Sequence, residues 1–206
     1  MIDKNILVGI ICLIIGYFLG SLPSGFLAGK WLLNIDLREI GSGSTGATNV
    51  LRHIGKKAAV VVFLVDVFKG MIAVLIVKSF QLDSGWEISA GLFSLAGHIW
   101  PVWLNWRGGK AVATGLGLFL GLSWPVALAS LGIFLACLGL TKIVSLASIC
   151  ASISLPILMF LSFSKDNISY TYLLVALISM VLVIWRHRTN IQRLIKGNEP
   201  KIGESR

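Results

Sequence analysis

Residues 111–140 read AVATGLGLFLGLSWPVALASLGIFLACLGL and contain no charged side chain. A helix needs about 20 apolar residues to cross a bilayer, so a run of this length is long for one straight span and short for two. The run is interrupted at Ser123-Trp124-Pro125, where proline removes a helical hydrogen bond and restricts the residue before it. One long kinked helix or two short helices fit these residues, and the charges on either side decide between them.

The other apolar runs cover roughly 5–28, 58–77, 88–104, 144–163 and 168–185. The chain of 206 residues is 56% hydrophobic and 13% charged, against about 25% charged in a soluble domain. In lipid each backbone polar group must be bonded inside its own segment, which favours helices. The sequence therefore predicts an all-α integral membrane protein. No linker is long enough to separate a second soluble fold, so we expect residues 1–206 to form a single membrane-embedded domain.

The first run ends in SLPSG (21–25), whose small residues are also compatible with the cleavage site of a signal peptide. The charge before the run is weak, because Asp3 offsets Lys4. Cleavage would also leave the basic segment 30–57 outside the cell. We therefore favour a retained membrane helix.

Positive charge sets the orientation, because cytoplasmic loops carry an excess of lysine and arginine. Segment 29–57 has five cations against two carboxylates, whereas the loop 78–87 has one against two. The stretch around Lys110 and the C-terminal tail are basic again. With Lys110 and the tail both inside, the chain must cross the membrane an even number of times between them. The runs 144–163 and 168–185 supply two crossings, so 111–140 must also cross twice, as a hairpin of two short helices. We predict about seven transmembrane or short membrane helices, with the N-terminus outside and the C-terminus cytoplasmic.

Three polar islands interrupt the apolar runs: GSGSTGATNVLR at 41–52, NWRGGKAVAT at 105–114 and RHRTNIQRLIKGNE at 186–199. The predicted topology places all three at the cytoplasmic face. An apolar protein has little physical reason to keep cations beside glycines and hydroxyls unless these groups bind an anion. We expect the three islands to form one cationic site for phosphorylated substrates.

The first island matches a GxGxxG pattern and nearly matches a P-loop, but no strand precedes it and Ala47 occupies the position of the P-loop lysine. Its glycines still let backbone N–H groups approach phosphate oxygens, and Arg52 can add bidentate charge-assisted bonds. Hydroxyls are supplied by Ser42, Ser44, Thr45 and Thr48. A flexible interfacial loop is the alternative for this island taken alone.

The second and third islands combine cations with helix ends. Lys110 precedes a helix expected to begin near Ala111, which places a cation beside exposed helix N–H groups. Arg107 is equally well explained as a membrane anchor. In the third island His187 and Asn190, and Asn190 and Arg193, are three apart and therefore neighbours on a helix face. A polybasic stripe at anionic lipid is the alternative there.

Three further polar residues lie deep in apolar runs. Asp66 and Lys69 are mid-span at i, i+3, where they either neutralise each other or serve the site. His98 lies near the inner end of its helix, three residues before Pro101, and a lone interfacial histidine is more often structural.

Several activities lack their characteristic residues. No histidine is followed by aspartate at the fifth position, which excludes a thioester-using acyltransferase with an HxxxxD dyad. No DxxD cluster is present to bind magnesium, which disfavours a CDP-alcohol phosphotransferase. Cys12, Cys137 and Cys150 lack CxxC or Cys/His spacing, so no disulfide framework and no metal site are expected. The net charge of +9 indicates anionic partners. Cations placed between membrane spans favour lipid over nucleic acid.

Together with SLPSG, Asp66, FKG (68–70) and Gly97-His98, the islands resemble the motifs of the bacterial membrane acyl-phosphate:glycerol-3-phosphate acyltransferases (the PlsY family) over essentially the whole chain. The chain departs from the family pattern at Ser44, where asparagine is common, and at Ala111, where glycine is common. The resemblance implies a seven-helix enzyme that transfers a fatty acyl group from acyl phosphate to the sn-1 hydroxyl of glycerol 3-phosphate. The products are lysophosphatidic acid and phosphate, the first step of phospholipid biosynthesis.

The resemblance also implies residue roles, carried over motif by motif. Catalytic roles fall to Ser42, Arg52, Lys110 and His187. Substrate-binding roles fall to Ser24, Gly43, Thr48, Asn49, Lys69, His98 and Asn190. No metal, cofactor, coenzyme A or carrier-protein thioester is implied. The implied protein is a monomer in the bacterial cytoplasmic (inner) membrane, with its site open to the cytoplasm and with membrane lipid and the two substrates as partners.

Two groups are candidates for the general base that takes the proton of the attacking hydroxyl: His187 and the substrate's own phosphate, whose second pKa is near 6. We favour the substrate phosphate, because no carboxylate–histidine pair is evident in the sequence. An organic-phosphate transporter is the alternative from another functional class, since transporters also bind phosphate at the ends of broken helices. It predicts an internal repeat, and none is evident. A lipid-binding protein without catalysis leaves the glycine-rich loop unexplained.

Overall fold

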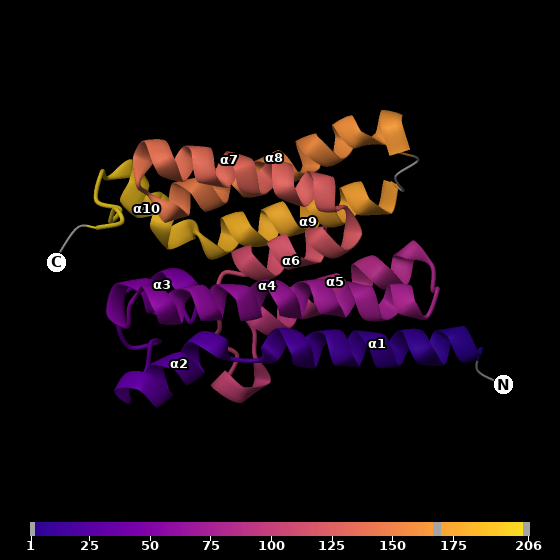
Figure 1. The fold of residues 1–206 in the computed structure, drawn as a ribbon, viewed down its shortest axis with the longest axis horizontal. Helices are drawn as coiled ribbons and strands as arrows, with labels where there is room; N and C mark the ends of the chain where they lie inside the picture. The colour runs from indigo at the N-terminus through magenta and orange to yellow at the C-terminus, as the bar shows by residue number, and fades with distance from the viewer. Residues whose placement is uncertain (1–2, 167–169, 204–206) are drawn as a thin grey trace. The chain divides into compact units, whose positions relative to one another are not determined.

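The computed structural model describes residues 3–166 and 170–203. Within these residues the regular structure is entirely helical (Figure 1), as the sequence predicts. The chain divides into two compact units, Met1–Leu122 and Ser123–Arg206, and each is described in turn.

The first unit contains six α-helices and one short 3-10 turn, coloured from indigo to rose in Figure 1. These elements are α1 (Lys4–Ser21), α2 (Ser24–Leu33), α3 (Ala47–His53), α4 (Lys56–Ser79), α5 (Ser84–Ile99), the 3-10 turn η1 (Val102–Leu104) and α6 (Val112–Leu122). The first apolar run is therefore two helices, because Pro23 interrupts it directly after Leu22. The run expected over 88–104 ends at Ile99, since Pro101 follows two residues later.

Small residues let the helices of this unit approach closely. α1 packs along α5, and α4 packs along α6. A Cβ at Gly20 would collide with the backbone carbonyl of Ser94, and one at Gly117 would collide with the carbonyl of Val67. Close backbone approach at small residues is the usual way in which membrane helices associate. These contacts set the spacing of α1, α4, α5 and α6 around the polar residues described below.

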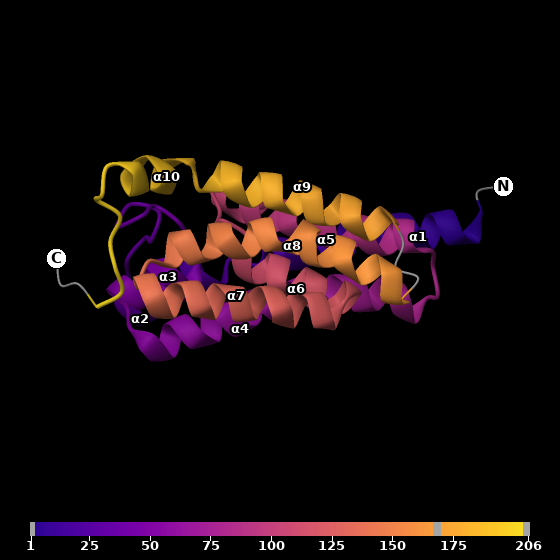
Figure 2. The same cartoon turned by 90° about the horizontal axis from the view of Figure 1, so that it is seen from above.

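The second unit contains α7 (Trp124–Thr141), α8 (Val144–Asp166), α9 (Tyr170–Arg186) and α10 (Arg188–Ile195). α8 packs against both α7 and α9, as Figure 2 shows. Pro125 lies in the first turn of α7, where its missing N–H costs no helical hydrogen bond. α9 and α10 meet at an angle of 61°. The C-terminal segment then returns to the turn between α7 and α8, where Ile202 N donates to the carbonyl of Lys142 over 2.8 Å.

The predicted break in 111–140 is confirmed, because α6 ends at Leu122 and α7 begins at Trp124. The two predicted helices are both present, with unequal lengths. α6 has 11 residues, but α7 has 18 and is long enough to cross a membrane. The sequence predicted the break near Pro125, where it lies, and α7 is longer than α6.

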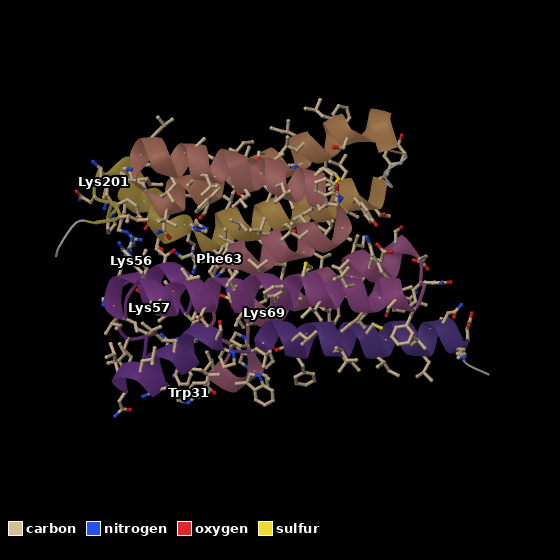
Figure 3. All side chains as sticks on the ribbon, in the orientation of Figure 1. Trp31, Lys56, Lys57, Phe63, Lys69 and Lys201 are labelled. Carbon is tan, nitrogen blue, oxygen red and sulfur yellow. The ribbon has the colours of Figure 1, made fainter. Side chains whose placement is uncertain are left out.

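Among the described residues, four helical segments are long and apolar enough to cross a membrane, and the bent pair α9–α10 is a fifth candidate. These segments are Lys4–Leu33, Lys56–Ser79, Trp124–Thr141 and Val144–Ser162. α5 and α6 are shorter, so the count of seven stays a prediction. The apolar surface fits lipid: Ile14 on α1 is 50% exposed and Val61 on α4 is 60% exposed. Figure 3 shows Lys56 and Lys57 at the start of α4, whereas Lys69 lies within the helix.

Candidate active site

A buried ion pair lies in the middle of α4. Lys69 Nζ is 2.7 Å from Asp66 Oδ1, and the two side chains are 3% and 2% exposed. The Ser24 hydroxyl donates to the same carboxylate oxygen over 2.8 Å. Lys69 also donates to the carbonyl of Leu22, at 3.2 Å, in the break between α1 and α2. The pair is thus neutralised, and it also ties α4 to the start of α2.

His98, near the end of α5, lies beside this pair. Its Nδ1 is 3.1 Å from the Thr114 hydroxyl of α6 and 3.7 Å from Asp66 Oδ1. The longer distance exceeds a hydrogen bond, so Thr114 is the direct partner. No pattern in the sequence indicates a carboxylate near an imidazole. The structure corrects this expectation at His98, because the packing of α4, α5 and α6 brings together residues that are far apart in the chain.

The second island packs directly on His98. Gly109 N donates to the carbonyl of His98 over 3.0 Å, and Gly108 N donates to that of Ile99 over 3.2 Å. A Cβ at Gly109 would collide with the imidazole ring. Both glycines are therefore needed so that the backbone before Lys110 can lie against α5.

A small pocket opens beside the ion pair. Its polar lining comes from the α1–α2 break, the first island, α4 and α5, and consists of Ser21, Ser24, Thr45, Lys69 and His98. Three of the predicted substrate-binding residues, Ser24, Lys69 and His98, are therefore brought together.

The first island forms a loop that is organised around Asn49. This side chain is 1% exposed. Its amide nitrogen donates to the carbonyls of Leu37, Ser44 and Ile40 over 2.9, 3.0 and 3.2 Å, and its oxygen accepts from Ser42 N over 3.2 Å. The amide hydrogens are thereby engaged within the loop. The structure thus shows Asn49 holding the loop, and a direct contact between this residue and phosphate stays a prediction.

Glycine is required twice in this loop. Gly41 and Gly43 have φ of +59° and +65°, in the left-handed region that glycine enters without steric cost. α3 follows immediately. Thr48 is half-buried in its first turn, and Arg52 is exposed in its last turn.

Lys110 is half-buried and directly precedes Ala111, which has φ +59° and is 1% exposed. An alanine in the left-handed region is strained by about 1–2 kcal/mol. This conformation gives the physical reason why glycine suits the position. The backbone reverses here so that α6 can begin at Val112, close to the predicted start.

Arg38 joins the segment before the first island to the segment before the second. Its Nη2 is 2.6 Å from Asp36 Oδ2, its Nη1 donates to the carbonyl of Leu104 over 3.1 Å, and its guanidinium lies 5.0 Å from the centre of the Phe26 ring. The hydrogen bond from Arg38 holds the pKa of Asp36 below its ordinary value, against an opposing effect of burial. No pattern in the sequence indicates a role for this pair.

The third island, in the second unit, is organised by Glu199. This side chain is 2% exposed and accepts hydrogen bonds from Asn190 Nδ2, Arg193 Nε and Ser145 Oγ over 2.6, 2.7 and 2.8 Å. Burial alone would raise the pKa of Glu199, but these bonds and the charge of Arg193 hold the pKa below its ordinary value. The predicted shared face of Asn190 and Arg193 is confirmed. Glu199 was missed, and its only sequence signal was an acidic residue inside a basic island.

His187 lies at the bend between α9 and α10. It is 3% exposed, and its Nδ1 is 2.8 Å from the carbonyl of Val183. A carbonyl can only accept, so Nδ1 carries the hydrogen in this contact and Nε2 is the basic nitrogen of the neutral ring.

Fold and site together define a helical integral membrane protein with buried, charge-paired polar residues and two basic, glycine-rich segments packed beside them in one unit. A family model described as glycerol-3-phosphate acyltransferase matches residues 10–197. The chain belongs to this family, and the resemblance found in its motifs is confirmed.

Curated relatives from Prochlorococcus marinus carry the name glycerol-3-phosphate acyltransferase. The protein of strain NATL1A is 62% identical over 95% of this chain and 98% of its own length. The protein of strain MIT 9211 is 59% identical over 97% of each chain. The family membership favours an acyltransferase over the transporter alternative.

Two solved structures of PlsY (YgiH), an integral membrane glycerol 3-phosphate acyltransferase, are also similar. The glycerol 3-phosphate form has a TM-score of 0.88 and 42% identity, with coverage of 95% of this chain and 96% of the other. The lysophosphatidic acid form has a TM-score of 0.85 and 41% identity, with coverage of 95% of each chain.

Proposed function

We propose that this glycerol-3-phosphate acyltransferase uses acyl phosphate as its donor and acylates the sn-1 hydroxyl of glycerol 3-phosphate. The observation that carries this proposal is the joining of the first two islands, through Thr45 and Gly109, to one buried polar cluster within a single compact unit. The forms in which PlsY (YgiH) was crystallised, with glycerol 3-phosphate and lysophosphatidic acid, support the acceptor and the product.

An acyl phosphate is an activated anhydride, so its reaction needs positioning and charge stabilisation more than a protein nucleophile. The sn-1 oxygen attacks the acyl carbon, the bond from that carbon to the phosphate oxygen breaks, and inorganic phosphate leaves. Ser42, Arg52 and Lys110 would stabilise the phosphate charge as it develops. The expected contacts of Gly43, Thr48 and Asn49 with phosphate, and of Asn190 with glycerol phosphate, belong to the same proposal.

The proton of the attacking hydroxyl passes to a base. We favour the phosphate of the bound acceptor, because the carboxylate beside His98, that of Asp66, is already used by Lys69 and Ser24. In His187→Ala we then expect most of the activity to remain. A fall in kcat with an unchanged KM would instead identify the imidazole as the base.

The topology of the proposal follows from charge. In this topology the protein has seven membrane helices in the bacterial inner membrane, with the N-terminus outside and the C-terminus inside. The site is open to the cytoplasm. Residues 1–206 would act as one domain and as a monomer that needs no cofactor. Lys56 and Lys57, both exposed before the first apolar turns of α4, support a cytoplasmic start of that helix.

The test supplies the purified protein with acyl phosphate and glycerol 3-phosphate and measures lysophosphatidate, with the position of the acyl group established on the product. Acyl-CoA in place of acyl phosphate should give no product, and Arg52→Ala should lose most of the activity. Arg107→Ala removes an exposed arginine of the second island and is the matched control, with activity retained. Equal rates with acyl-CoA would exclude the proposed donor.

A further inference from the structure

Arg38 lies three residues before the first island, and its guanidinium is committed to groups of the protein. Nε and Nη2 donate to the carboxylate of Asp36 over 3.0 and 2.6 Å, and Nη1 donates to the carbonyl of Leu104 over 3.1 Å. One face of the guanidinium covers the Phe26 ring of α2, at 5.0 Å from the ring centre. Each of its three nitrogens is thus engaged within the first unit. Arg38 is therefore a poor candidate for a direct contact with phosphate, although it belongs to a basic segment.

The carbonyl that Arg38 holds lies at a strained turn. Asn105 and Trp106 follow it with φ of +50° and +63°, in the left-handed region that is strained for a bulky side chain such as that of Trp106. Arg107 N donates to the same Leu104 carbonyl over 3.2 Å and closes the turn. Such a backbone persists only where its surroundings hold it in place. Arg38 supplies a charge-assisted hydrogen bond at this point.

The turn leads directly into the glycines of the second island. Gly108 N donates to the carbonyl of Ile99, and Gly109 N donates to that of His98, so the backbone lies against the end of α5 immediately after the turn. Lys110 is the next residue. The direction in which the chain leaves the turn therefore determines where the backbone before Lys110 lies.

The backbone around Arg38 is fixed to the first island. Asn49 donates to the carbonyls of Leu37 and Ile40, which flank Arg38, over 2.9 and 3.2 Å. Gly43 lies against the Arg38 carbonyl, which is 3.3 Å from the place that a Cβ at Gly43 would occupy. The backbone of Arg38 is thus held by the first island, while its side chain holds the start of the second.

We propose that Arg38 is a positioning residue that sets the place of the second island relative to the first, so that both bind one phosphate group of a substrate. The inference rests on the proposed function and deepens it, because that function assigns Ser42, Arg52 and Lys110 to phosphate. Asp36 serves the same role through Arg38, since its carboxylate orients the guanidinium. Arg38 itself touches no reacting atom.

The test measures KM and kcat of Arg38→Met for glycerol 3-phosphate and for acyl phosphate separately. Misplaced islands bind phosphate less well, so we expect the KM of at least one of the two substrates to rise about 10-fold, with a smaller change in kcat. The substrate with the raised KM is the one whose phosphate the two islands share. A merely structural role would reduce the amount of folded enzyme, which lowers the apparent kcat and leaves KM unchanged. That outcome would overturn the inference.

A double-variant cycle tests whether Asp36 acts through Arg38. Asp36→Asn should raise the same KM about 3-fold, because the guanidinium loses its ionic partner. The double variant Asp36→Asn/Arg38→Met should have the KM of Arg38→Met alone, since the carboxylate has nothing left to orient. A further rise of KM in the double variant would overturn the role given to Asp36.

Lys57→Met is the matched control, because it removes an exposed cation of the same basic segment and should leave both KM values unchanged. If Arg38→Met fails to fold, Arg38→Lys tests the same point. Lysine keeps the charge but lacks the planar fork that reaches Asp36 and Leu104 together, so KM should still rise. A wild-type KM in Arg38→Lys would overturn the inference and leave the proposed function standing. A wild-type protein that makes no lysophosphatidate from acyl phosphate would instead overturn the proposed function.

Discussion

Lys69 neutralises Asp66 within α4, three residues away, at 2.7 Å and with both side chains almost fully buried. The pair also forms hydrogen bonds with the chain break between α1 and α2, because Ser24 donates to the carboxylate of Asp66 and Lys69 donates to the carbonyl of Leu22. Polar residues of this kind in a membrane helix are costly unless each charge is matched.

We expect Lys69→Met to destabilise the protein by about 3–5 kcal/mol, because it leaves the Asp66 carboxylate buried without its cation. The double variant Asp66→Asn/Lys69→Met should recover much of this loss. Thermal unfolding in detergent measures both. The control is Lys78→Met, because Lys78 is 34% exposed and 3.8 Å from Glu87, and such a pair contributes about 0–1 kcal/mol. Equal losses in Lys69→Met and Lys78→Met would contradict the assignment of a tightly coupled buried pair.

A second prediction concerns the backbone before α6. Ala111 has φ +59°, and Ala111→Gly relieves that strain while adding freedom to the unfolded chain, so we expect a net gain of up to about 1 kcal/mol. Ala113→Gly, two residues later inside α6, should instead lose about 1 kcal/mol. Thermal unfolding of the two variants side by side decides the matter. A loss of stability in both would mean that the methyl group of Ala111 contributes more by packing than it costs in strain.

Much of this architecture could be predicted because its signals are local. Apolar runs located the long helices, and Pro125 marked the division between α6 and α7. The i, i+3 spacing anticipated the Asp66–Lys69 pair, and the spacing of the third island anticipated the shared face of Asn190 and Arg193. α3 escaped prediction because a seven-residue helix in a polar island has no apolar periodicity to reveal it.

What the sequence could not supply depends on packing between distant segments. His98 meets Asp66 and Thr114 only because α4, α5 and α6 lie together. The hydrogen bond from Arg38 to the carbonyl of Leu104 likewise joins residues that are 66 apart in the chain. Asn49 was assigned to phosphate from its motif position, whereas its contacts within the loop depend on how the chain returns past Leu37 and Ile40.

The hydrogen bonds of Glu199 predict a dependence of stability on pH. Because the pKa of Glu199 is lowered on folding, its contribution is complete above the ordinary glutamate pKa of about 4.3 and is lost as the pH falls through the folded-state value. We expect Glu199→Gln to lower stability at pH 7 by about 1–3 kcal/mol and to lower it less and less below about pH 4. Thermal unfolding across this range measures the effect. Glu39→Gln, at an exposed glutamate, is the control and should leave the dependence of stability on pH unchanged. A difference in stability between Glu199→Gln and wild type that stays constant with pH would show that the charge of Glu199 is not involved.

The proposed cytoplasmic site requires the three islands to be shielded from reagents outside the cell. Ser44, Gly109 and Asn190 are buried and would react poorly from either side, so cysteine is better placed at the exposed positions Lys57, Arg107 and Lys196, in a background that lacks Cys12, Cys137 and Cys150.

A membrane-impermeant thiol reagent added to intact cells should leave the three new cysteines unlabelled and should label them once the membrane is opened. Gln81→Cys, exposed in the acidic loop after α4, is the external control and should react in intact cells, because that loop carries the opposite charge balance. Labelling of position 57, 107 or 196 from outside would place that part of the chain on the wrong side of the membrane for cytoplasmic substrates and would exclude the proposed topology.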